Sequence, residues 1–96
     1  MTSKQRAYLK SLAMTMDPIF QIGKSSITPE LTMAIDEALE ARELIKLTVL
    51  KNCMDDIRSV AEVLGERTKS EVVQVIGRRF VLYRPSKEKK KIELPL

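Results

Sequence analysis

Apolar and polar residues alternate along this chain with two different periods, which predict helices and strands in turn. An apolar residue at every third or fourth position predicts three amphipathic helices, over about residues 2–15, 29–41 and 55–68. Shorter runs rich in β-branched and aromatic residues predict four strands, over residues 18–22, 43–50, 71–76 and 79–84. The pattern therefore predicts a single α/β domain of order α-β-α-β-α-β-β, in which helices pack on a four-stranded mixed sheet.

The second predicted helix separates its apolar positions from its acidic ones. Leu31, Ile35 and Leu39 recur with the helical period and form one apolar stripe. The acidic residues that lie largely away from this stripe are Asp36, Glu37 and Glu40. We expect them to form a solvated face, not a metal site or a catalytic acid/base pair, because charged helix faces normally meet water.

A short loop at residues 23–28 joins the first strand to the second helix and has the features of a phosphate site. Gly23 has no Cβ atom, so the backbone there can come close to a ligand. Thr28 is a good N-cap, and Pro29 suits the first helical position. The helix would then begin with free N–H groups and a partial positive charge, with Lys24 just upstream.

Charge is distributed unevenly along the chain, whose formal net charge is +4. Residues 72–96 hold seven bases and two acids, whereas residues 29–43 hold one base and five acids. The bases at loop or hairpin positions are Lys24, Arg78, Arg79 and Arg84. Such bases can bind the phosphates of a nucleic acid, but they can also serve only to keep a small protein in solution. The sequence leaves both interpretations open.

Catalytic chemistry has little support in the composition. The chain has no histidine, so the common triads and most zinc sites are absent, and its one cysteine, Cys53, lacks the usual activating base. Gly23-Lys24-Ser25 lacks the first glycine of a P-loop, because Pro18 stands at that position. We therefore expect no enzyme activity, no cofactor and no bound nucleotide. A lone cysteine fits a reducing cytoplasm, and no segment approaches membrane-spanning length, so we expect a cytoplasmic location without membrane contact.

Six short segments, in order and with short spacers, resemble the CRM-domain family: Lys4–Lys10, Gln21–Lys24, Ile35–Leu39, Glu43–Lys46, Val73–Arg79 and Leu82–Ser86. The resemblance is to the stand-alone bacterial branch, the YhbY-like proteins, and covers nearly the whole chain. It implies that residues 1–96 form an RNA-binding domain similar to the C-terminal domain of translation initiation factor three. For this branch it also implies association with precursors of the large ribosomal subunit. The residues themselves predict that 85–96 are a basic C-terminal tail, because Pro85 ends regular pairing and charged residues follow it.

The family carries a Gly-x-x-Gly loop, likened to the loop with which KH domains clamp a nucleic-acid backbone. Here the loop reads Gly23-Lys24-Ser25-Ser26, so Ser26 replaces the second glycine. If that position requires a positive φ, serine strains it by roughly 1 kcal/mol. Either the loop relaxes, or Ser26 uses its hydroxyl on a phosphate. A second departure is Lys69-Ser70, where family members often have a glycine after the third helix.

The loop, the charge distribution and the resemblance together predict an RNA-binding surface. Its expected residues are Gly23, Lys24, Ser25, Ser26 and Thr28 of the loop, Arg78, Arg79 and Arg84 of the final hairpin, and Lys4, Arg6 and Lys10 of the first helix. The rings of Phe80 and Tyr83 either stack on bases or pack in the core. The expected partner is ribosomal RNA in large-subunit precursors. The alternative is a protein-docking module on the ribosome, in which the acidic second helix meets a basic ribosomal protein.

Overall fold

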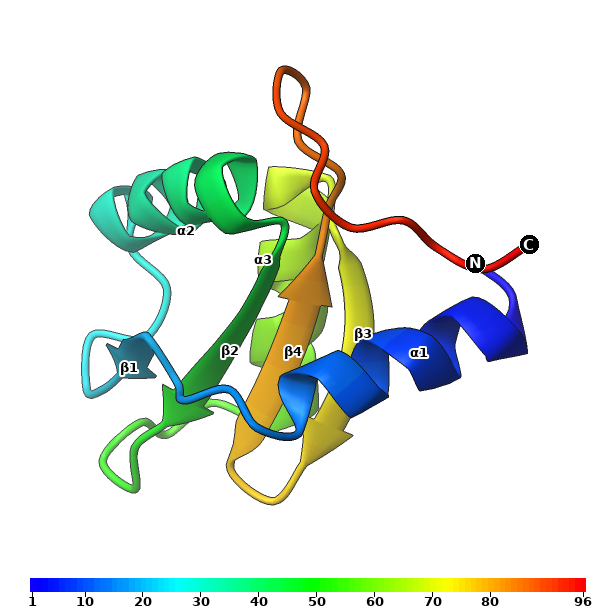
Figure 1. Cartoon of the computed structure of the whole chain (residues 1–96). Coiled ribbons are helices and arrows are strands. Elements are labelled where there is room, and N and C mark those ends of the chain that lie inside the picture. The colour runs from blue at the N-terminus through cyan, green and yellow to red at the C-terminus, as the bar shows by residue number, and fades with distance from the viewer.

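Helices and strands alternate in the computed structural model, which describes residues 1–96. The elements are α1 (Ser3–Ala13), β1 (Phe20–Ile22), α2 (Pro29–Arg42), β2 (Leu44–Val49), α3 (Ile57–Thr68), β3 (Glu71–Ile76) and β4 (Arg79–Tyr83). The strands form one sheet in the order β1-β2-β4-β3. β1 runs parallel to β2, and the other neighbours are antiparallel, so the predicted mixed sheet is confirmed. α1 lies on one face of this sheet, whereas α2 and α3 cover the other (Figure 1).

Side-chain alternation on the central strands divides the apolar core into two clusters. Ile45, Leu47 and Phe80 point towards α2 and α3, in a cluster of 12 buried residues. Val81 and Tyr83 point towards α1, in a second cluster of 6 buried residues. Phe80 and Tyr83 are 0% and 5% exposed, so both rings pack in the core and neither is open to a base.

Each helix begins at a polar cap, as its sequence favours. The Thr2 hydroxyl accepts from the N–H of Gln5, whose side chain in turn accepts from the N–H of Thr2, forming a capping box. The Asp56 carboxylate caps α3 in a similar way. Lys69 ends α3 in the left-handed conformation, with φ of 55° and ψ of 42°, where glycine is the usual residue.

A buried carboxylate fastens the C-terminal tail to the sheet. Glu43 is 0% exposed and accepts from the N–H groups of Ser86, Lys91 and Ile92 at 2.7, 2.7 and 2.8 Å. Burial alone would raise the pKa of the Glu43 carboxyl, but these three hydrogen bonds and the charge of Lys91 hold it below its ordinary value of 4.5. Ile92 then packs against the α1 side of the core, so the tail is ordered along the domain.

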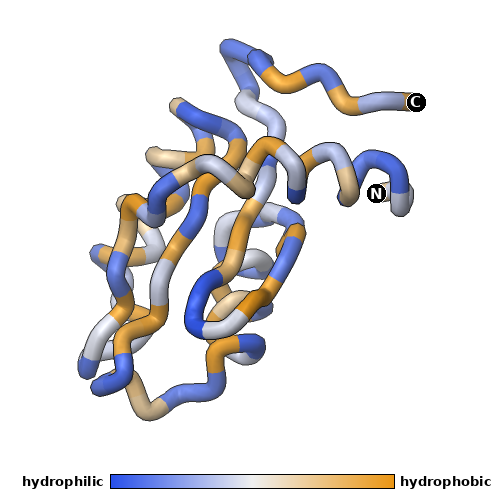
Figure 2. Tube along the Cα trace, turned by 60° about the horizontal axis from the view of Figure 1, so that its bottom comes forward, coloured by the Kyte–Doolittle hydropathy of each residue, from blue (hydrophilic) through white to orange (hydrophobic).

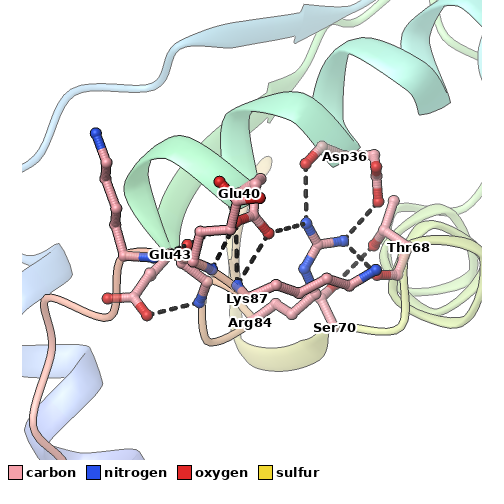
Figure 3. Close-up of polar contacts among 10 residues, drawn as sticks. Asp36, Glu40, Glu43, Thr68, Ser70, Arg84 and Lys87 are labelled. Atoms are coloured by element: carbon pink, nitrogen blue, oxygen red, sulfur yellow. Dashed lines mark hydrogen bonds and ion pairs between the residues drawn. The ribbon is translucent and has the colours of Figure 1, made fainter.

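Glu40 binds the start of the same tail. Its carboxylate accepts from the Ser86 hydroxyl at 2.7 Å and from the N–H of Lys87 at 3.0 Å (Figure 3). The hydrogen bonds from Ser86 and Lys87 hold the pKa of the Glu40 carboxyl below its ordinary value of 4.5. Asp36 is exposed, as expected, although it also pairs with Arg84, whereas Glu40 is only partly exposed and is occupied by the tail, so the expected solvated face is wrong for Glu40 alone. Nothing in the local spacing of α2 predicts partners more than forty positions away.

No helix combines the length with the apolar character that a membrane crossing requires.

Candidate nucleic-acid interface

Three connections meet at one end of the sheet: the loop after β1, the turn after β2, and the turn between β3 and β4. Backbone hydrogen bonds join them, from the N–H of Leu50 to the carbonyl of Ile22 at 2.8 Å and from that of Val49 to the carbonyl of Arg78 at 2.7 Å. This end lies at the bottom of Figure 1 and comes forward in Figure 2, where hydrophilic colours mark the turns. We call it the basic end, defined by Lys24, Lys51, Arg78 and Arg79, all of which are exposed.

The loop after β1 is a tight turn with its strain at Ser26. The N–H of Ser26 donates to the carbonyl of Gly23 at 2.9 Å, and Ser26 has a φ of 53°. The loop has therefore not relaxed away from the conformation that favours glycine. Neither expected adjustment occurs, because the Ser26 hydroxyl oxygen is buried without a hydrogen-bond partner and so does not face a phosphate.

The same loop leaves several donors without a partner in the protein. The Thr28 hydroxyl accepts from the N–H of Leu31 at 3.0 Å, as expected for an N-cap. Pro29 has no N–H, and that of Ser26 is used in the turn. The backbone N–H groups that donate to no protein acceptor belong to Lys24, Ser25, Ile27, Thr28 and Glu30. These donors, next to the positive end of the α2 dipole, suit an anion.

The predicted arginines separate into two groups. Arg78 and Arg79 flank the β3–β4 turn at the basic end, and Arg78 also holds that turn to β2 through its Nε, 2.8 Å from the Val49 carbonyl. Arg84 lies beyond the far end of β4, about 17 Å from Arg79 at the rise of a strand. The three arginines of the hairpin, which were expected to belong to one RNA-binding surface, therefore do not lie together.

Arg84 is occupied by protein partners. Its Nη1 lies 2.5 Å from an Asp36 carboxylate oxygen and 2.9 Å from the carbonyl of Thr68, and its side chain is 11% exposed (Figure 3). Of the 17 lysines and arginines, Arg84 alone makes an ion pair. We therefore assign Arg84 a structural role, tying α2 to the end of α3, and leave it out of the candidate interface.

The bases of α1 also differ from one another. The Nη1 of Arg6 donates to the carbonyls of Val72 and Val73 at 2.6 and 3.0 Å, which fastens α1 to β3. Lys10 is exposed at the last turn of α1 and lines a hollow together with Arg79, so it adjoins the basic end. Lys4 is exposed about 9 Å further from this end along the helix axis.

Two further lysines lie at the basic end or in the hollow beside it but were not among the predicted site residues. Lys51 lies in the turn after β2, between the loop and the hairpin turn. Lys46 lies on β2 opposite Val81, on the face of the sheet that α1 covers only in part. The alternation of β2 placed Lys46 away from the main core, and that signal could have identified it.

Comparison with known proteins finds relatives over the whole chain. Residues 1–84 match the family described as CRS1 / YhbY (CRM) domain. The probable RNA-binding protein YqeI of Bacillus subtilis is 50% identical over 95 residues, covering 99% of each chain. An RNA-binding protein of Haemophilus influenzae is 36% identical, over 99% of this chain and 95% of its own length. The solution structure of the hypothetical protein SAV1595 from Staphylococcus aureus superposes with a TM-score of 0.82 at 57% identity, over 99% of both chains.

Proposed function

The chain belongs to the CRS1/YhbY (CRM) domain family, and we propose that it binds RNA through the basic end without catalysing a reaction. The observation that carries this proposal is the gathering of exposed, unpaired bases beside unpartnered backbone donors at a single end of the sheet. The names of the relatives from Bacillus subtilis and Haemophilus influenzae, both RNA-binding, support the same partner.

The proposed contacts are to the sugar–phosphate backbone. One phosphate lies against Lys24 and the free N–H groups of the loop, where charge and helix dipole act together. Lys51 and Arg79 contact neighbouring phosphates, and Arg78 keeps the two turns at a fixed distance while its remaining N–H groups stay available. Contacts of this kind provide affinity and register, while sequence preference must come from elsewhere.

The RNA that we propose is ribosomal RNA in precursors of the large subunit, in the cytoplasm. This assignment rests on the resemblance of the chain to the stand-alone members of its family. The competing hypothesis, docking of a basic ribosomal protein on α2, has less support because Asp36 and Glu40 already bind Arg84 and the tail.

Filter binding of ribosomal RNA fragments at several salt concentrations tests the proposal. Lys24→Gln with Arg79→Gln removes two bases of the basic end, and each lost phosphate contact should reduce the salt slope by about 0.7–0.9. The matched control, Arg67→Gln with Lys90→Gln, removes the same two residue types from exposed positions outside this end.

Equal losses in the two double variants would refute the basic end as the interface. A chain that ignores protein-free RNA but is retained by ribosomal proteins would refute RNA binding itself and favour docking.

A further inference from the structure

A hollow of about 480 Å³ lies between the last turn of α1 and the half of the sheet that α1 leaves uncovered. Strand register places Val81 between Lys46 and Gln74, and in the next row Arg79 lies between Thr48 and Ile76. Directly opposed residues share a face, and all members of these two rows except Thr48 line the hollow. Its size is that of an ordinary small-molecule site.

Five of the ten residues that line the hollow are apolar. Ala13 of α1 and Val81 of β4 line it, and each is 1% exposed. Met14 and Ile76 lie at its rim and are 78% and 61% exposed. Together these side chains give the hollow an apolar surface that a ligand with an apolar body could cover.

The charged residues that line the hollow are all cations, namely Lys10, Lys46 and Arg79. None of the three makes an ion pair, and no carboxylate lines the hollow. Its complement is therefore a ligand with a flat, largely apolar body and several negative charges around it. In RNA, an unstacked nucleotide has this chemistry, because its base offers two apolar faces and its flanking phosphates carry charge.

We propose that the hollow receives one unpaired nucleotide of the RNA, with the base against Met14 and Ile76 and the adjacent phosphates near Lys10, Lys46 and Arg79. This inference rests on the proposed function and adds to it the class of RNA. A continuous duplex keeps its bases inside the helix and cannot fill the hollow, whereas a single strand, loop or bulge can.

The test compares a single-stranded RNA with the same strand in a full duplex. Met14→Ser with Ile76→Ser removes the apolar rim without changing the charge, and should weaken single-strand binding by roughly three- to tenfold while leaving duplex binding unchanged. The matched control is Met33→Ser with Met54→Ser, two methionines that are 65% and 90% exposed outside the hollow. Lys46→Gln should reduce the single-strand salt slope by about 0.7.

A crosslinking measurement on the unmodified protein keeps the inference testable if a variant folds poorly. A single-stranded RNA with one 4-thiouridine should crosslink to peptides that contain Met14 or Ile76, as read by mass spectrometry. Three results would each overturn the nucleotide pocket. The first is crosslinking only to peptides that contain neither Met14 nor Ile76. The second is an equal loss of single-strand and duplex binding in the Met14/Ile76 variant, and the third is competition by an acidic peptide as strong as competition by RNA. Loss of binding in the Lys24/Arg79 variant together with an unaffected Met14/Ile76 variant would overturn the pocket alone and leave the proposed function standing.

Discussion

Replacing Glu43 by glutamine tests whether one buried carboxylate holds the C-terminal tail. The substitution keeps the size of the side chain and the backbone preference at φ of 68°, so it changes little except charge and acceptor capacity. The two carboxylate oxygens accept three backbone N–H groups, from Ser86, Lys91 and Ile92. The amide of glutamine has a single acceptor oxygen, so its NH₂ group must face at least one of these donors.

The cost follows from the hydrogen bonds that are lost. A hydrogen bond to a charged group contributes about 1.5–3 kcal/mol, and a buried donor left without a partner costs about 1–3 kcal/mol. Since at least one such bond is lost and the others are weakened, we expect the free energy of unfolding to fall by about 2–4 kcal/mol. Urea denaturation measures this change, and hydrogen exchange should show faster exchange of the Ser86, Lys91 and Ile92 amides.

The pH dependence supplies an independent check. The folded-state pKa values of Glu40 and Glu43 are lowered, so the stability they contribute is fully present above their ordinary value of 4.5 and is lost as the pH falls through the lower folded values. The glutamine variant should lose part of this acid dependence. The control is Glu37→Gln, on α2, which ends just before Glu43; Glu37 has no side-chain partner, so this variant should stay within about 0.5 kcal/mol of the parent. A Glu43→Gln protein as stable as that control, with unchanged tail amides, would refute the role of Glu43.

Three further predictions concern other residues. Ser26→Gly should stabilise the protein by about 0.5–1 kcal/mol in a thermal melt, because φ is 53°, whereas Ser25→Gly, without a positive φ, should not; a loss in Ser26→Gly would contradict the strain. Arg84→Gln should lower the free energy of unfolding by about 2 kcal/mol and leave the salt slope of RNA binding unchanged; a slope change as large as that of Arg79→Gln would return Arg84 to the interface. Burial, with the charge of Glu43, raises the pKa of Tyr83 above 10.0, so its contribution to stability is present below pH 10.0 and is lost as the pH rises through the folded value; an absorbance titration of a Tyr8→Phe variant in which Tyr83 ionises at or below pH 10.0, before unfolding, would contradict this.

Local patterns were sufficient for the fold. Alternation in β2 predicted which residues face the main core, and the Thr28 cap and the Gly77 turn set the boundaries of α2 and the final hairpin. Helical spacing alone could not predict the partners of Glu40 and Glu43, because these belong to a tail more than forty residues later. One sign was present in the sequence, because Glu43 stands beside apolar residues at the start of the second predicted strand. A carboxylate that is buried there needs hydrogen-bond donors.

The sequence alone could have shown that Arg84 lies apart from Arg78 and Arg79. Arg78 and Arg79 were predicted at the turn of a hairpin, and Arg84 at the end of its second strand. A strand is extended, so the two positions had to lie at opposite ends of the sheet. The prediction treated residues that are close in the sequence as if they were also close in space. Lys46 was missed although the alternation of β2 placed it away from the main core, because the sequence does not show how much of that face α1 covers.

The carboxylates of α2 also determine how the molecule presents charge to a polyanion. Asp36 and Glu40 neutralise Arg84 at the end of the sheet where the tail begins, and with Glu37, Glu88 and one base, Lys89, they line a hollow there. The bases at the opposite end keep their full charge because no acid is paired with them. At the tail end, acids therefore offset the bases of Arg84 and the tail, whereas at the basic end no acid pairs with a base, so a polyanion is attracted more strongly to the basic end. This difference orients an approaching RNA before any contact forms, so replacing Asp36 or Glu40 should change the rate of association even though neither residue touches the proposed interface.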